Sequence, residues 1–141
     1  MLDRYPSMNR AETILLIDDD VFLGDAYKTK FERAGFTVIV HHDAQQALQK
    51  LRDGLRPDLI LLDLMMPGMD GFAFLGQAKL EKLPLPPIVV LTNQEEVQQK
   101  EEAFALGANN YIAKASATPG EILEQIIQIL RTQEELSKKT S

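Results

Sequence analysis

The sequence of 141 residues contains no cysteine and no tryptophan. The absence of cysteine excludes disulfide bonds, zinc sites built on thiolates and cysteine nucleophiles. No apolar run approaches the roughly 18 residues of a membrane span, and residues 1–10 lack the apolar core of a secretion signal. These absences predict a protein of the reducing cytoplasm that has no membrane partner.

Positive charge is scarce as well. Lysine and arginine total 15 against 21 aspartates and glutamates, so the formal net charge is −6. Nonspecific binding to nucleic acid or to anionic lipid needs an excess of basic side chains. We therefore expect no nucleic-acid partner and look for protein partners instead.

Short apolar runs alternate with helix-period segments along the whole chain. The runs are rich in Ile, Val and Leu, as strands covered on both faces should be, and they span residues 13–17, 36–40, 58–62, 87–91 and 110–113. Asp43 and Asp70 stand where helix N-caps belong, and glycines stand where helix C-caps belong, at Gly35, Gly54 and Gly107. Such alternation predicts right-handed crossovers and a doubly wound parallel α/β sheet.

The organisation is that of a single domain. We expect residues 1–11 to form an N-terminal extension, residues 12–135 the domain, and residues 136–141 a polar tail after a last helix that ends near 135. That helix repeats apolar residues at helical spacing, and Ile122 and Ile129 widen its apolar stripe. We expect this flank to be partly exposed and to serve as a contact surface.

Acidic residues follow two of the predicted strands. Asp63 ends the run 58–62 and opens a Pro/Gly turn, and Asp18, Asp19 and Asp20 follow the run 13–17. The carboxyl ends of parallel strands line one edge of the sheet, so these acids should meet there. Clustered carboxylates repel one another unless a cation joins them, and oxygen ligands suit Mg²⁺. Asp20 itself is predicted to cap the following helix.

Two further polar residues end strands at the same predicted edge. Thr92 follows the run 87–91, and Lys114 follows the run 110–113. Phosphoryl transfer to a carboxylate explains this set economically. Asp63 would be the nucleophile, Mg²⁺ held by the acids would neutralise phosphoryl oxygens, and Thr92 and Lys114 would bond the remaining ones.

Other classes of protein fit the same residues less well. Dinucleotide-binding and P-loop enzymes need a glycine-rich turn after the first strand, where this chain has acids. A phosphatase of the haloacid dehalogenase type stays open as a minor alternative, because Asp18 and Asp20 have its two-residue spacing. The stripe from Val21 to Phe31 is interpreted as core, and His41 and His42 are placed outside the acidic cluster.

Four segments together resemble the receiver domain of two-component response regulators. The similarity runs from about residue 12 to 135 in the order of the family, and it is carried by Ile14–Asp20, Asp58–Gly71, Thr92 and Gly107–Lys114. The resemblance implies a flavodoxin-like (βα)₅ fold with strand order 2-1-3-4-5. It also implies that Asp63 accepts phosphate from a histidine kinase or a histidine phosphotransfer protein.

The resemblance assigns roles to individual residues. Asp19 would bind Mg²⁺ directly, Asp18 through water, and the backbone carbonyl of Met65 would be a further ligand. Thr92 would move toward the phosphate and let Tyr111 turn inward. This movement would remodel the surface formed by the helix before Gly107, the strand 110–113 and the helix 119–135.

From the resemblance we expect a stand-alone phosphorylated signalling domain rather than an enzyme. It would act on a downstream protein, or as a homodimer, through that remodelled surface. A phosphorylation-independent receiver that serves purely as a binding module is the main rival.

One position departs from the family pattern. Lys114 is followed by Ala115, where most members have proline after a cis peptide bond. A cis bond before alanine costs roughly 2.5–4 kcal/mol, against about 0.5–1 before proline. We therefore expect a trans bond and a loop placed differently after the strand 110–113.

Overall fold

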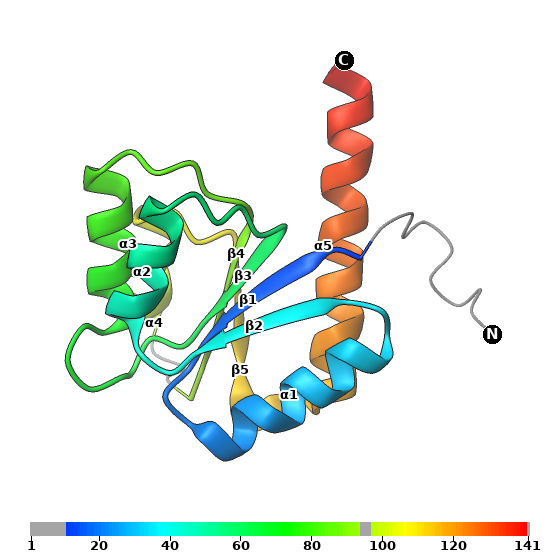
Figure 1. Ribbon diagram of the computed structural model, residues 1–141, viewed down its shortest axis with the longest axis horizontal. Coiled ribbons are helices and arrows are strands. Elements are labelled where there is room, and N and C mark those ends of the chain that lie inside the picture. The colour runs from blue at the N-terminus through cyan, green and yellow to red at the C-terminus, as the bar shows by residue number, and fades with distance from the viewer. Residues whose placement is uncertain (1–10, 94–96, 141) are drawn as a thin grey trace.

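The computed structural model describes residues 11–93 and 97–140 (Figure 1). The predicted N-terminal extension, apart from Ala11, lies outside the described residues. The strands are β1 (Thr13–Ile17), β2 (Thr37–His41), β3 (Leu59–Leu62), β4 (Ile88–Thr92) and β5 (Asn110–Ala113). The helices are α1 (Val21–Arg33), α2 (Ala44–Arg52), α3 (Gly71–Leu80), α4 (Val97–Ala105) and α5 (Pro119–Thr140), with a 3₁₀ turn η2 at Lys114–Ser116.

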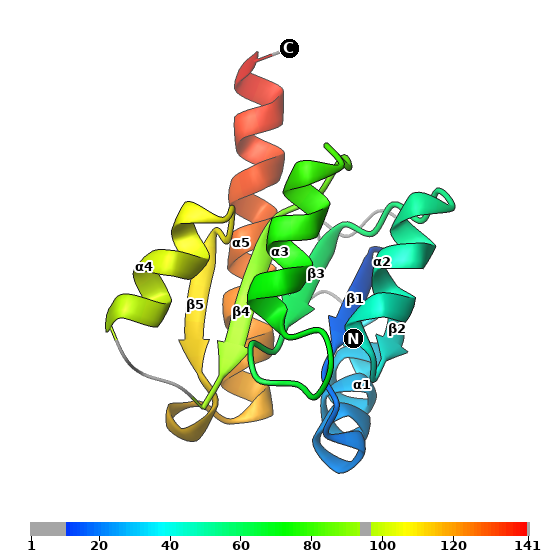
Figure 2. The ribbon, with the colours of Figure 1, turned by 90° about the vertical axis from the view of Figure 1, so that its left-hand side faces the viewer.

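The strands form one parallel sheet in the order β2-β1-β3-β4-β5. This is the predicted order, and it confirms the doubly wound, flavodoxin-like fold. Ile17 pairs with His41 on one side and with Leu62 on the other, so β1, β2 and β3 end level with one another. Figure 2 shows the carboxyl ends of the strands at the lower edge of the sheet, beside the loop that follows β3.

Two apolar layers cover the two faces of the sheet. Alternate residues of a strand point to opposite faces, so Ile60 joins a core with Leu48 of α2 and Phe74 of α3. Leu61 joins the other core, with Phe31 of α1 and residues of α5. The central strand β3 is apolar at every position because both of its faces are buried.

Acidic side chains begin three of the helices, as predicted. Asp20 accepts a hydrogen bond from the backbone of Leu23, and Asp70 accepts one from the backbone of Ala73. Asp43 caps α2 in the same way. Because these caps satisfy amides that a helix cannot satisfy internally, they fix where each helix leaves its loop.

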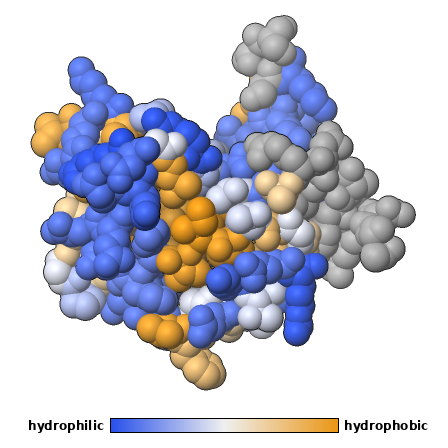
Figure 3. Space-filling view, in the orientation of Figure 1, coloured by the Kyte–Doolittle hydropathy of each residue, from blue (hydrophilic) through white to orange (hydrophobic). Residues whose placement is uncertain are grey.

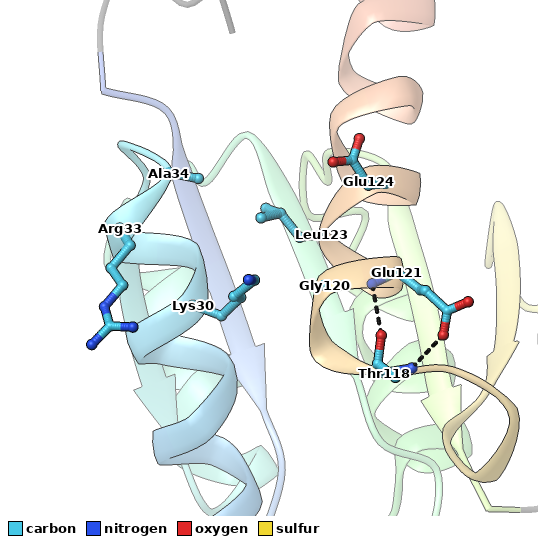
Figure 4. Close-up of a pocket in the computed structure, with 8 residues that line it drawn as sticks. All are labelled: Lys30, Arg33, Ala34, Thr118, Gly120, Glu121, Leu123 and Glu124. Carbon is cyan, nitrogen blue, oxygen red and sulfur yellow. Dashed lines mark hydrogen bonds between the residues drawn. The ribbon is translucent and has the colours of Figure 1, made fainter. Parts of the chain in front are cut away.

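Helix α5 begins with a reciprocal cap and runs further than predicted. The hydroxyl of Thr118 accepts from the Glu121 amide at 3.1 Å, and the Glu121 carboxylate accepts from the Thr118 amide at 2.9 Å (Figure 4). The helix continues to Thr140, so most of the predicted polar tail is helical. Apolar periodicity stops near Leu130, but no proline or glycine follows to end the helix.

Two expectations about exposed and buried apolar residues are wrong. Ile122 is fully buried and Ile129 packs against the core shared with α1, so the expected exposed flank of α5 is largely core. Conversely, Val21 and Phe22 are 55% and 86% exposed. They occupy the first turn of α1, which extends past the strand ends in Figure 1.

Across residues 11–93 and 97–140, we find no helix of the length and apolarity that a bilayer crossing needs.

Candidate functional site

Backbone pairing of the two central strands delivers Asp18 and Asp63 to the same edge. The Asp63 amide donates to the Ile17 carbonyl at 2.9 Å, and the Asp18 amide donates to the His41 carbonyl at 3.1 Å. Each acid is therefore held by one more rung of the ladder, just past its strand. Carboxylate oxygens of Asp18, Asp19 and Asp63 all lie within 4.8 Å of one another.

Lys114, which directly follows the edge strand β5, completes the cluster. Its ammonium donates to Asp18 at 2.9 Å and to Asp63 at 3.2 Å. Asp18 is 1% exposed and Asp63 6% exposed, whereas Asp19 is open to solvent. The sequence-predicted acids and lysine are thus brought together, and a buried ion pair joins them.

The donor set fits a magnesium ion. Three carboxylates face one ammonium, so the cluster carries an excess of negative charge that a divalent cation would neutralise. All three ligands are oxygens, and the exposed Asp19 leaves room for the waters that Mg²⁺ retains. Met65 lines the pocket, and its amide donates to Asp63 at 3.2 Å. A ligand role for its carbonyl stays a prediction.

The environment shifts the pKa values of the central pair. Burial raises the pKa of Asp63 to about 6; the charge of Lys114 opposes this rise, and the charge of Asp18 adds to it. Burial disfavours the charged form of Lys114, but hydrogen bonds and the charges of both acids outweigh burial and raise its pKa above the ordinary value. The lysine is therefore cationic at neutral pH, while Asp63 is poised to gain from a bound cation.

Asp20 supports the site without belonging to the metal group. Its amide donates to Asp18 at 2.9 Å, and its carboxylate caps α1. The prediction of a capping role is confirmed. A phosphatase of the haloacid dehalogenase type would need Asp20 as its second catalytic acid. That alternative loses support because the Asp20 carboxylate bonds the amide of Leu23.

Thr92 and Tyr111 lie where strand pairing predicts, but their switch roles stay predictions. Thr92 is the last residue of β4 and is fully buried, and the next residue, Asn93, lines the acidic pocket. Tyr111 is half-buried and packs against the core on the α2, α3 and α4 face. Both are thus one strand or two away from Asp63 in the sheet.

The loop after β5 keeps Lys114 in place without a cis bond. Among the residues that the structure describes, no peptide bond is cis, so the expected trans bond before Ala115 is confirmed. Lys114 to Ser116 form a 3₁₀ turn instead. The lysine nevertheless reaches both acids, which shows that a different loop still serves the same contact.

The acidic pocket has a volume of about 410 Å³. A larger pocket of about 460 Å³ lies between α1 and α5, and its lining includes Lys30 and Arg33 of α1 and Glu121 and Glu124 of α5 (Figure 4). Its charged groups are of both signs and open to solvent, and it has no buried carboxylate. The chemistry, rather than the size, marks the acidic pocket as the functional site.

Comparison with known proteins agrees with this geometry. Residues 14–127 match the model of the response regulator receiver domain. The chain belongs to this family. Receiver domains are signalling domains, and this one carries the family's acidic pocket.

The chain is similar in sequence to the receiver parts of longer transcriptional regulatory proteins. The receiver is 36% identical over 121 residues to the alkaline phosphatase synthesis transcriptional regulatory protein PhoP of Bacillus subtilis, covering 86% of this chain and 49% of the relative. It is 38% identical over 118 residues to the transcriptional regulatory protein CpxR of Escherichia coli, covering 84% and 49%. The chain spans about half the length of these curated relatives.

Solved structures of similar fold are matched over almost their whole length. A CheY-like receiver domain protein from Methanospirillum hungatei has a TM-score of 0.79 and 28% identity, covering 89% of this chain and 98% of that one. The chemotaxis protein CheY4 of Vibrio cholerae has a TM-score of 0.75 and 27% identity, covering 84% and 98%.

Two features of the site were missed in the sequence. His42 bonds the backbone of Asp18 at 2.8 Å, although it was placed outside the cluster. Phe22 was assigned to the core, yet it stands exposed directly after the acidic loop. A signal for Phe22 was available: an N-cap at Asp20 puts the next two residues in a first turn that has no strand beside it.

Proposed function

We propose that this receiver accepts a phosphoryl group on Asp63 from a histidine kinase or a histidine phosphotransfer protein, with Mg²⁺ bound by Asp18, Asp19 and Asp63. The observation that carries the proposal is the contact of one lysine, Lys114, with two buried acids, Asp18 and Asp63, at the carboxyl ends of the strands. A carboxylate that is buried, paired and still open to a pocket is suited to attack phosphorus.

Asp63, Lys114 and Asp18 each have a separate role in the phosphoryl transfer. A carboxylate oxygen of Asp63 forms the new bond to phosphorus while the bond from phosphorus to the donor's histidine nitrogen breaks and leaves its electron pair on the imidazole. Lys114 bonds a phosphoryl oxygen, and Asp18 orients that lysine from 2.9 Å. A Mg²⁺ ion held by Asp18, Asp19 and Asp63 would neutralise charge on the phosphoryl oxygens.

Exposed apolar side chains beside the pocket support a protein donor. Val21 and Phe22 directly follow Asp20, and Met65, which is 51% exposed, lines the pocket itself. Figure 3 shows apolar atoms protruding at the lower end of the molecule, where α1 begins in Figure 1. Apolar side chains around a charged pocket favour a partner that covers the site while it delivers phosphate.

Labelling by a small phosphodonor tests this function. Acetyl phosphate with Mg²⁺ should add a phosphoryl group to the parent chain, and mass spectrometry should detect none on Asp63→Asn. Stable labelling identifies the receiver, whereas continuous release of phosphate would identify the phosphatase. No reaction would identify a pure binding module. Undiminished labelling of Asp63→Asn would move the nucleophile, with Asp18 as the next candidate.

We further propose output by protein contact through α4, β5 and α5, in the cytoplasm, by a receiver that acts alone or as a homodimer. Phe104 of α4 is 39% exposed and Tyr111 of β5 is half-buried, so this face offers apolar area. The relatives are named transcriptional regulatory proteins and are about twice as long. The mass of the natural gene product distinguishes a stand-alone receiver from one joined to a further domain.

A further inference from the structure

His42 lies directly after β2 and bonds the acidic loop that follows β1. Its Nδ1 is 2.8 Å from the backbone oxygen of Asp18. A carbonyl oxygen can only accept, so Nδ1 carries the hydrogen of this bond. The bond joins a side chain of one loop to the main chain of another across the ends of two neighbouring strands.

The bond takes the place of the next rung of the β1–β2 ladder. The Thr37 amide donates to Glu12 at the start of this pair, and the Asp18 amide donates to the His41 carbonyl at its end. In a parallel ladder the Asp18 carbonyl also points toward β2, where the amide of Asp43 would come next. The chain instead turns at Asp43, which caps α2. The imidazole of His42 supplies the donor to the Asp18 carbonyl in place of the Asp43 amide.

The peptide that His42 holds is the one that carries Asp19. The carbonyl of Asp18 and the amide of Asp19 belong to one planar unit, so fixing the oxygen fixes the plane. Asp19 is exposed and gains little positioning from packing. Its carboxylate therefore depends on the backbone for its place beside Asp18 and Asp63.

The imidazole is itself braced. Its Cε1 lies 3.7 Å from the point that a Cβ on Gly24 would occupy, so the ring rests against α1. The Gly24 amide donates to the Asp20 carbonyl at 2.9 Å. The ring thus touches both ends of the segment 18–24, which contains the acidic loop and the first turn of α1.

We propose that His42 is a positioning residue of the phosphorylation site: its Nδ1–H bond to the Asp18 carbonyl holds the Asp19 carboxylate in place for Mg²⁺. This inference rests on the proposed function for the metal and on geometry alone for the positioning. It predicts that a hydrogen-bond donor at position 42, rather than an imidazole ring, is what the site needs.

A near-isosteric pair of variants tests it. Asparagine keeps a donor nitrogen at the topological place of Nδ1, and leucine keeps the branched shape without the donor. His42→Leu should weaken Mg²⁺ affinity by about fivefold, the effect of losing one ordinary hydrogen bond, and His42→Asn should restore it. His41→Leu is the matched control, since His41 holds Asp18 through a backbone oxygen that the substitution leaves in place.

A second measurement needs no metal. Hydrogen exchange of the Asp20 amide, which donates to Asp18 Oδ1, should be faster in metal-free His42→Leu and parental in His42→Asn and His41→Leu. If leucine and asparagine behave alike, or if leucine matches the parent, His42 has no positioning role. If the parent chain binds no Mg²⁺, the proposed function fails, and the exchange rates still decide the role of His42.

Discussion

Lys114 and Asp63 come together from two strands that are not neighbours, with the lysine nitrogen 3.2 Å from the carboxylate. The same nitrogen is 2.9 Å from Asp18. One ammonium thus bridges the acids that follow β1 and β3, although a 3₁₀ turn replaces the usual cis-proline after it. Three acids and one lysine leave the cluster short of positive charge, and the predictions on pH dependence and on magnesium depend on that imbalance.

The pH dependence of stability should report the raised pKa of Asp63. Above pH 6 the folded protein holds this carboxylate ionised at a cost, and the cost disappears as the pH falls through about 6 toward the ordinary value near 4. In metal-free buffer, Asp63→Asn should therefore raise the free energy of unfolding at pH 7, by about 1–2 kcal/mol after allowing for solvent at the pocket mouth. The gain should vanish below pH 4.

Urea unfolding at several pH values measures this effect. Asp25→Asn, which removes an exposed acid of α1, is the control for the change in net charge. A gain that is equal in the two variants, or independent of pH, would contradict a raised Asp63 pKa.

Magnesium affinity should depend on Asp19. Three carboxylates without a complete protein cage should bind Mg²⁺ weakly, at about millimolar concentration, and Asp19→Asn should weaken binding about tenfold. Titration followed by calorimetry or NMR gives both values. Asp25→Asn removes the same charge outside the pocket and should bind like the parent; equal affinities in all three proteins would rule out the proposed metal site.

Phe22 should matter to a protein donor and not to a small one. Phe22→Glu places a charge beside the other exposed apolar side chains near the pocket, so transfer from a histidine kinase should slow by at least about tenfold. Labelling by acetyl phosphate should be unchanged because the pocket itself is intact. Leu80→Glu is the matched control, since Leu80 is 76% exposed at the far end of α3. Equal slowing in both variants would show that the partner does not dock at α1.

Gly71 should tolerate no side chain. A Cβ there would lie 2.6 Å from the backbone oxygen of Asp63 and 2.8 Å from the Cα of Leu64, and neither atom can move without shifting the loop of the acceptor. Gly71→Ala should lower the free energy of unfolding by about 1–3 kcal/mol and weaken Mg²⁺ binding. Gly76→Ala, in the same helix but with open space around it, should be neutral or stabilise by up to about 1 kcal/mol.

Thermal or urea unfolding and one Mg²⁺ titration of each glycine variant suffice. Equal stability of Gly71→Ala and Gly76→Ala would mean that the loop after β3 is softer than its contacts indicate.

The sequence was a good guide wherever apolar periodicity and turn residues agree. The meeting of Asp18, Asp63 and Lys114 follows from strand ends in a parallel sheet, and the three acidic caps follow from the preference of Asp for the N-cap position, whereas the strand order came from the family resemblance. Strand limits shifted by one residue, as at Phe36, because an apolar residue in a turn looks like strand. Such shifts leave the site intact, since the polar residues after the strands mark the edge.

Other features depend on the three-dimensional arrangement of the chain and cannot be predicted from the pattern of residue types. The bond of His42 ends on a backbone oxygen of Asp18, 24 residues away, so nothing in residue types announces it. The exposure of Phe22 depends on how far α1 extends past the sheet. The helical pattern placed Ile122 outside the stripe that packing on the sheet alone would bury. Ile122 is nevertheless buried, because α1 and the sheet together cover a wider arc of α5.

Helix α5 is held by the core along its first half and projects from the domain along its second (Figures 1 and 2). Leu130 is the last buried residue among those α5 side chains that the structure describes, and Lys138 lies roughly 12 Å further along the axis at 1.5 Å per residue. A helix anchored in this way is a lever arm. A tilt of about 10° at the buried half would displace the axis at Lys138 by roughly 2 Å, so a spin label at that position would amplify small movements of the core into measurable changes of distance.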